Sequence, residues 1–175
     1  MKTCLLPLLA LLALAQCKKK ADPDPVDQLP PATQTGANTF GCLVNGQAWT
    51  PKGYSGTSNY SIAYDSGLNG GVFDLRTYRY PDSGNEYQYI IMYANRMSRT
   101  GAYSFVNTNQ TEASLHDTAK KCYWSSRDST YRRGSLTITR LDLQAGIISG
   151  TFAFTLYKPG CDTLKVTQGR FDKRL

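Results

Sequence analysis

The side chains that could act as general acids and bases are few and scattered along this chain. Two pairs of carboxylates have the residue types that a glycoside hydrolase uses as acid and base. These pairs are Asp82 with Glu86 and Asp65 with Asp74. His116 is the single histidine and the candidate general base. Because these groups lie in polar segments, among turn formers such as Asp-Ser-Gly, we expect them to be solvated turn and loop residues. We therefore expect the chain not to be an enzyme.

Signatures of the common enzyme classes are missing from the sequence. It contains no G-x-S-x-G motif of serine hydrolases, no H-E-x-x-H motif of zinc proteases and no glycine-rich phosphate loop. The three cysteines after residue 37 lie far apart, which together with a single histidine matches no compact metal-ligand pattern. We expect neither a cofactor nor a metal.

Contact with a ligand is the chemistry that the sequence favours. The net charge is +7, and a cluster of basic residues suits anionic glycans or lipopolysaccharide. The cluster consists of Lys120, Lys121, Arg127, Arg132 and Arg133. The alternative interpretation is a solvated loop whose cations bind nothing in particular.

Tyrosines offer a second kind of contact. The chain has 12 of them, and the tyrosine ring stacks on sugars or lines protein interfaces. We include Tyr78 and Tyr80 in the candidate binding patch. Since tyrosine is also a preferred strand residue, the alternative is that both are strand residues without a ligand.

The elements that would position these residues follow an export signal. A charged start and an apolar run over residues 4–15 are typical of a secretory signal peptide, and the run is too short for a membrane span. Residues 1–16 are therefore the predicted signal peptide. Lysines at 18–20 follow it and would lie against lipid headgroups.

The end of the apolar run resembles a bacterial lipobox. Its sequence is LAQC at residues 14–17, in which Gln16 replaces the usual small residue. We expect cleavage before Cys17 and lipidation of Cys17, although whether Gln16 impairs cleavage stays open. The lipid would hold the protein at the outer membrane, and the sequence leaves open whether it faces the periplasm or the cell surface.

Residues 17–37 are predicted to be a flexible tether. They are rich in proline and polar residues and have almost no apolar side chains to form a core. Residues 38–175 suffice for one domain with a single core.

Strand periodicity dominates that domain. Residues 148–156 alternate between apolar residues and small or polar residues, with the period of two that a strand requires. Further strands are expected at residues 40–44, 72–80, 87–93, 135–139 and 163–167. We expect an all-β fold, either a single antiparallel β-sandwich or a partly closed barrel, that ends in a C-terminal meander.

Local signals refine this prediction. Asn45-Gly46 is the strongest hairpin signal in the chain, and a slip of the apolar phase predicts a β-bulge near Gly169. Residues 87–93 have two apolar faces, which is typical of a central strand. Residues 107–121 are expected to form a polar loop or a short helical turn.

The cysteines indicate an oxidising compartment. With Cys4 removed and Cys17 lipidated, Cys42, Cys122 and Cys161 remain for one disulfide and one free thiol. The connectivity cannot be derived from the sequence. We favour Cys122–Cys161, because both lie near strand ends whereas Cys42 lies within an apolar strand face.

Four motifs carry a resemblance to a known family. They are LPPATQ (29–34), TFGCLVNG (39–46), ISGTF (148–152) and GRFD (169–172). Together they are similar to a Bacteroidota lipoprotein family of unknown function, over essentially the whole mature chain. The resemblance implies an exported all-β lipoprotein and supplies no catalytic or binding residues.

The same lineage implies a modification. Exported proteins of this phylum are O-glycosylated at a short Asp-Ser/Thr-apolar pattern, which the sequence matches at three places. The candidate acceptors are Thr118, Ser129 and Thr163. The first two fall in expected loops, where a transferase could reach them.

An envelope-anchored binding module fits these features best. We expect it to bind a glycan or another envelope protein without catalysis, as a monomer and with no nucleic-acid partner. The alternatives are a purely structural envelope component and a small carboxylate-dependent hydrolase. Binding predicts an exposed tyrosine and arginine patch, whereas an enzyme predicts a cleft with convergent acids.

Overall fold

The computed structural model describes residues 22–80, 86–106 and 109–175. The expected signal peptide, Cys17, the lysines at 18–20 and Asp82 lie outside these residues, so their roles stay predictions. Within the described ranges, no helix is long and apolar enough to cross a membrane.

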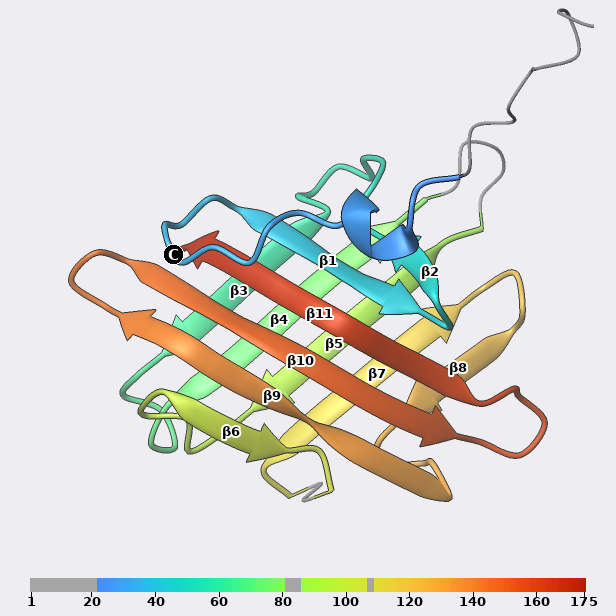
Figure 1. Cartoon of the computed structure of the whole chain (residues 1–175). Helices are drawn as coiled ribbons and strands as arrows, with labels where there is room; N and C mark the ends of the chain where they lie inside the picture. Colours follow the sequence, from blue (N-terminus) through green and yellow to red (C-terminus); the bar gives the residue numbers. More distant parts are fainter. Residues whose placement is uncertain (1–21, 81–85, 107–108) are drawn as a thin grey trace, which may run out of the picture.

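Two antiparallel sheets pack face to face as a β-sandwich, and their strands run in crossing directions (Figure 1). The strands of sheet A are β1 (Thr39–Val44), β2 (Gln47–Trp49), β6 (Gly101–Ser104), β9 (Tyr131–Asp142), β10 (Ile147–Tyr157) and β11 (Leu164–Arg174). The strands of sheet B are β3 (Tyr60–Asp65), β4 (Val72–Arg79), β5 (Gln88–Ala94), β7 (Thr111–Asp117) and β8 (Cys122–Ser125). Their spatial orders are β2-β1-β11-β10-β9-β6 and β3-β4-β5-β7-β8. The sheets do not close into a barrel, so the sandwich prediction is confirmed, including the β9-β10-β11 meander.

The core forms from one face of each sheet, as strand alternation requires. On β10, Phe152, Phe154 and Leu156 are at most 4% exposed, whereas Thr151 is exposed. Phe40 of β1 stacks on Phe152 with ring centroids 5.3 Å apart. The expected core face of β10 is therefore confirmed.

Two local signals are confirmed by backbone geometry. Asn45 and Gly46 join β1 to β2 with φ angles of 49° and 83°, the left-handed pair that a two-residue hairpin favours. The register of β11 against β10 shifts between Phe152 and Phe154, which marks a β-bulge around Gly169. A Cβ atom on Gly169 would lie 2.5 Å from the ring of Phe152, so the close approach of that ring requires glycine.

Sheet B contains two confirmed strands, β4 and β5, and one correction. β5 is the central strand of the sheet, as its two apolar faces predicted. Residues 111–117 form β7 rather than a loop or helical turn. The polar residues that suggested a loop, Glu112 and His116, occupy the outer face of β7, while Ala113 and Leu115 enter the core.

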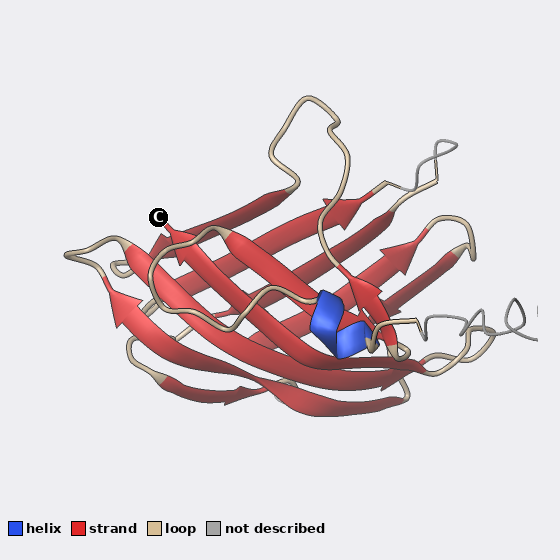
Figure 2. Cartoon of the chain, turned by 45° about the horizontal axis from the view of Figure 1, so that its top comes forward, coloured by secondary structure: helices blue, strands red, loops and turns tan. Residues whose placement is uncertain are grey.

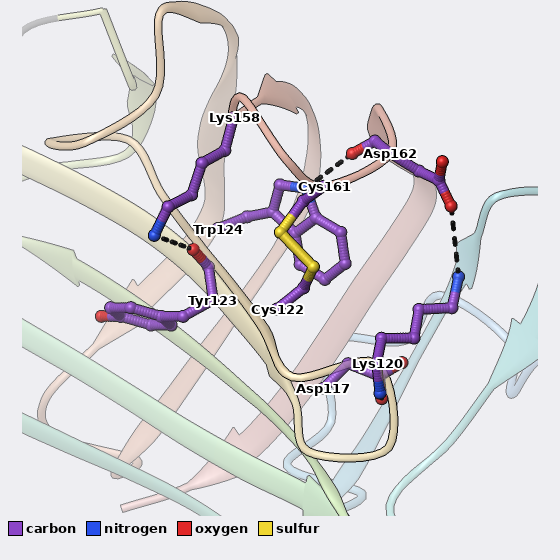
Figure 3. The surroundings of a disulfide bond; sticks show 8 residues. All are labelled: Asp117, Lys120, Cys122, Tyr123, Trp124, Lys158, Cys161 and Asp162. Atoms are coloured by element: carbon purple, nitrogen blue, oxygen red, sulfur yellow. Dashed lines mark hydrogen bonds and ion pairs between the residues drawn. A yellow bond between two sulfur atoms is a disulfide. The ribbon is translucent and has the colours of Figure 1, made fainter.

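A disulfide joins the two sheets and confirms the favoured pairing. Cys122, at the start of β8, is bonded to Cys161 in the loop between β10 and β11 (Figure 3). Next to it, the Trp124 indole donates a hydrogen bond of 2.7 Å to the Asp162 carbonyl. Cys42 is buried and free, and burial raises the pKa of its thiol well above the ordinary value. This thiol is therefore protonated and inert.

The segment that precedes β1 corrects the tether prediction. After the 3-10 helix η2 (Pro25–Gln28), residues 29–37, which we call the strap, run along the outside of sheet A toward the C-terminus (Figure 2). Leu29 is 8% exposed, and Pro30 packs on Gly41, where a Cβ atom would lie 2.7 Å from the proline ring. The strap is thus part of the folded domain.

One carboxylate holds the strap in place. Asp172 is 1% exposed and accepts hydrogen bonds from the backbone N–H groups of Thr35, Gly36 and Ala37 and from the Thr33 hydroxyl. The composition of the strap suggested disorder because few of its side chains are apolar, and much of its docking depends on these polar contacts in addition to Leu29 and Pro30. A short sequence window cannot identify Asp172 as the hydrogen-bond partner of the strap, because 139 residues separate it from Thr33.

Candidate functional site

Four aromatic side chains form a continuous row on sheet B. Successive ring centroids are 5.4 Å apart from Tyr80 to Tyr87, 6.1 Å from Tyr87 to His116 and 5.6 Å from His116 to Tyr123. We call these four residues the aromatic row. It begins just after β4, passes the start of β5 and crosses β7 and β8.

The aromatic row lies on the outer face of sheet B. His116 is opposite Tyr123 in the β7–β8 register, and it alternates with the buried Leu115 on the inner face. The rings are half-exposed, and Tyr123 is 38% exposed. Lys158 extends the row, since its Nζ lies 5.9 Å from the Tyr123 ring centroid. The row therefore presents ring surface to solvent.

Tyr78 is not part of this surface, contrary to the expected patch. It is 8% exposed, and its hydroxyl donates to the Thr57 carbonyl at 2.6 Å and accepts from the Ser55 N–H at 3.1 Å. These bonds fasten the loop before β3 to β4. Tyr80 keeps its expected place, because its ring packs against Tyr87 within the row.

The inner face of sheet B ends in a polar layer. Arg79 of β4 lies opposite Gln88 of β5, which lies opposite Asp117 of β7. The preceding layer, by contrast, contains the buried Ile90 and Leu115. Polar side chains at inward-facing positions indicate that this end of the sandwich is open to water or to a ligand.

Hydrogen bonds fix the orientation of this polar layer. The Trp49 indole donates to Gln88 Oε1 at 2.8 Å, and Gln88 Nε2 donates to Asp117 Oδ2 at 2.8 Å. The other Asp117 oxygen accepts the Lys120 backbone N–H at 3.1 Å. Both oxygens of the buried carboxylate thus have donors.

Two adjoining cavities, of about 350 and 260 Å³, open at the same end. Both are lined by Arg79, Gln88, Asp117 and Lys120, and we call them together the end cavity. Tyr87 lines the larger of the two. The aromatic row therefore leads directly into the end cavity.

The basic cluster expected from the sequence does not form one patch. Arg133 is opposite Thr155 and exposed, whereas the neighbouring Arg132 is half-buried and donates to the Ser129 carbonyl. Consecutive strand residues point to opposite faces, which separates these two arginines. Arg127 forms an ion pair of 2.8 Å with Glu112.

The two lysines of the cluster also differ in position. Lys121 is exposed at the turn between β7 and β8, with a φ of 52°. Lys120 lines the end cavity, and its Nζ lies 3.9 Å from the exposed Asp162 carboxylate (Figure 3). Lys120 is the one predicted cation that lines the end cavity. Arg79 also lines the cavity, although it was not among the predicted residues.

Two of the carboxylates considered for catalysis have structural partners. Asp65 accepts the backbone N–H groups of Gly67 and Leu68, as a turn former does. Asp74 forms an ion pair of 2.8 Å with Arg76. Glu86 is exposed where it lines the end cavity.

Metal-binding groups do not gather in the described part of the chain. No three His, Cys, Asp or Glu side chains there are placed to hold a metal ion. His116 contacts the rings of Tyr87 and Tyr123 instead.

The three candidate O-glycosylation residues differ in accessibility. Ser129 is 4% exposed, so the folded domain does not present its hydroxyl to a transferase. The Thr118 hydroxyl is held by Tyr87, from whose N–H it accepts at 2.7 Å and to whose carbonyl it donates at 3.0 Å. Thr163 is exposed before β11.

The fold defines the class of this protein as a two-sheet antiparallel β-sandwich with an open, polar end. A family described as a domain of unknown function (DUF6252) matches residues 82–173, and the chain belongs to this family. The matched region includes Tyr87, His116 and Tyr123 of the aromatic row. No curated protein matches the chain, and no solved structure does.

Proposed function

We propose that this protein is a non-catalytic glycan-binding module of the bacterial cell envelope, anchored to the outer membrane by a lipid on Cys17. The observation that carries the proposal is the aromatic row. From Tyr87 onward, successive rings meet edge to face, with interplanar angles of 75° between Tyr87 and His116 and 69° between His116 and Tyr123. Alternate rings can therefore turn an apolar face toward the C–H face of a sugar, while the tyrosine hydroxyls and His116 add hydrogen-bonding groups. A β-sheet face holds these rings in fixed positions, so binding costs little side-chain entropy.

The spacing of the row supports an extended ligand. Neighbouring ring centroids are 5.4–6.1 Å apart, which is close to the repeat of one pyranose ring in an extended chain. A glycan lying across the start of β5 and across β7 and β8 could therefore contact faces and edges of successive rings in turn. Lys158, above the Tyr123 ring, adds a cation at one end of this path.

The anchor supports a location where glycans are abundant. The LAQC sequence at residues 14–17 follows an apolar run of signal-peptide length. A lipid-anchored domain would face envelope polysaccharides at high local concentration. Weak contacts would suffice there, because tethering raises the effective concentration of binding partners.

A glycan array tests this proposal on the unlipidated mature chain from residue 18 onward. We expect binding to one class of oligosaccharide, with Tyr87→Ala and Tyr123→Ala each weakening the affinity about tenfold. Tyr93→Ala is the matched control, since Tyr93 is a half-exposed tyrosine on the outer face of the same sheet, opposite Glu112 and outside the row. Absence of glycan binding, or an equal loss with Tyr93→Ala, would contradict the proposal. Capture of an envelope protein through the same rings would favour a protein-binding module instead.

A further inference from the structure

We infer that the end cavity receives the carboxylate of an acidic sugar, with Arg79 and Lys120 as its receptors. The inference rests on the proposed glycan-binding function and specifies the class of sugar as uronic acids. It concerns residues that lie beside the aromatic row rather than within it.

Arg79 is the principal receptor. Its side chain points inward at the open end of sheet B and lines both parts of the end cavity. Within the described residues, its guanidinium donates one hydrogen bond, of 3.1 Å, to the Ala48 carbonyl. A guanidinium has five N–H donors in a planar fork that matches a carboxylate. That single bond fixes the position of the side chain and leaves donors for a ligand.

Lys120 is the second receptor. Its partner Asp162 is 3.9 Å away and has a side chain that is 83% exposed, so water screens their attraction. The backbone of Lys120 is fixed by its hydrogen bond to Asp117. The ammonium group can thus turn from Asp162 to a ligand carboxylate without moving the chain.

The buried carboxylate of the end cavity has its own hydrogen-bond donors. Both oxygens of Asp117 already accept hydrogen bonds, from Gln88 and from the Lys120 backbone. Glu86 is exposed, where water screens its charge. The remaining hydrogen-bonding capacity of Arg79 and Lys120 consists of donors alone, which suits an anionic acceptor.

The position of Tyr87 connects the two parts of the site. Its ring belongs to the aromatic row and also lines the larger part of the end cavity. A sugar on Tyr87 would therefore lie beside the cavity that Arg79 also lines. The carboxylate of a uronic acid is a ring substituent that could enter this cavity, and it is charged at neutral pH.

A matched pair of ligands tests the inference on the unlipidated mature chain. The probes are an oligogalacturonate and the methyl ester of the same oligosaccharide, which differ only in charge and esterification. We expect the acid to bind about tenfold more tightly than the ester by calorimetry, with the preference declining as salt is added. Arg79→Gln and Lys120→Gln should each reduce this preference, whereas Arg133→Gln and Lys165→Gln, both exposed on sheet A, should retain it.

The outcomes separate this inference from the proposed function. Equal affinity for acid and ester would overturn the inference and leave glycan binding standing. Failure of both probes to bind would also overturn it, while the array of neutral glycans would decide the proposed function independently. Lys120→Gln changes an exposed side chain, so it keeps the test decisive even if Arg79→Gln unfolds the domain.

Discussion

The hydroxyl of Thr33 donates a hydrogen bond of 2.7 Å to the carboxylate of Asp172, 139 residues further along the chain. This contact links the strap to the last strand of sheet A. Ser149 of the neighbouring β10 donates to the same carboxylate at 2.8 Å. One buried acid thus connects the strap, β10 and β11, and it should contribute strongly to stability.

Replacing this acid tests that role. Asp172→Asn keeps the shape of the side chain but exchanges one acceptor oxygen for a donor that faces other donors. We expect a loss of about 3 kcal/mol in the free energy of unfolding, because hydrogen bonds to a charged group contribute about 1.5–3 kcal/mol each. Urea unfolding measures it, with the exposed Asp162→Asn as control. Similar losses for both variants would contradict the role assigned to Asp172.

Asp172 also predicts how stability depends on pH. Burial alone would raise the pKa of Asp172, but hydrogen bonds from Thr33, Ala37 and Ser149 outweigh it and hold the pKa well below the ordinary 3.8. The unfolded chain therefore binds the proton first as pH falls. The stabilisation is complete above the unfolded pKa and is lost as pH falls toward the folded pKa.

Unfolding experiments between about pH 6 and pH 3 measure this dependence. We expect the stability of the wild type to decline below about pH 4, and the decline to be shallower in Asp172→Asn. Parallel curves would mean that other carboxylates cause the acid sensitivity.

Truncation of the strap should destabilise the domain. A chain beginning at residue 38 lacks every donor that the strap offers to Asp172, whereas a chain beginning at residue 29 keeps them all. We expect the shorter chain to melt at least about 5 °C lower in a calorimetric scan. Equal melting temperatures would support the original expectation that the segment is a dispensable tether.

The core face of β10 gives a prediction about packing. Phe152→Ala and Phe154→Ala should each lower the free energy of unfolding by about 3–5 kcal/mol, because each leaves a cavity beside a neighbouring ring. The exposed Thr151→Ala should change it by less than about 1 kcal/mol. Denaturant titrations compare the three variants, and a comparable effect of Thr151→Ala would show that the assigned face is wrong.

The lipid anchor is tested by fractionation. Cys17→Ser should move the protein from the membrane fraction to the soluble fraction if, as we propose, acyl chains on Cys17 provide the attachment. Cys4→Ser, within the expected signal peptide, is the control and should stay with the membrane. Intact-mass analysis checks the modification directly, and an unmodified mature protein with a different first residue would refute it.

The sequence predicted the features that depend on local periodicity. Alternation along residues 148–156 placed Phe152 and Phe154 correctly, and Asn45-Gly46 identified a hairpin from two residues. The same rule would have separated Arg132 from Arg133, because neighbours on a strand face opposite sides. Grouping them by proximity in the sequence ignored that rule, whereas the structure separates the exposed Arg133 from the half-buried Arg132.

The candidate site depends on relations that no single segment carries. His116 and Tyr123 come from neighbouring strands, and the β7–β8 register places them opposite each other. Tyr87 lies just before β5, and the β5–β7 register places Tyr89 rather than Tyr87 opposite His116. Likewise, Arg79 and Asp117 become neighbours of Gln88 through strand pairing. The register between strands that are distant in the sequence depends on which faces the packing of the two sheets buries. The local sequence pattern therefore could not predict which of these residues become neighbours.

The attachment of the strap has a mechanical consequence. Tension applied to the chain before residue 29 passes through the strap, whose hydrogen bonds converge on Asp172, before it can pull on β1. Several bonds share this load, and β11, which carries Asp172, is held along its length by β1 and β10. A domain drawn away from its point of attachment by a bound polymer would therefore resist the force at the strap first. The tension would reach the core strands only after the strap had detached from sheet A.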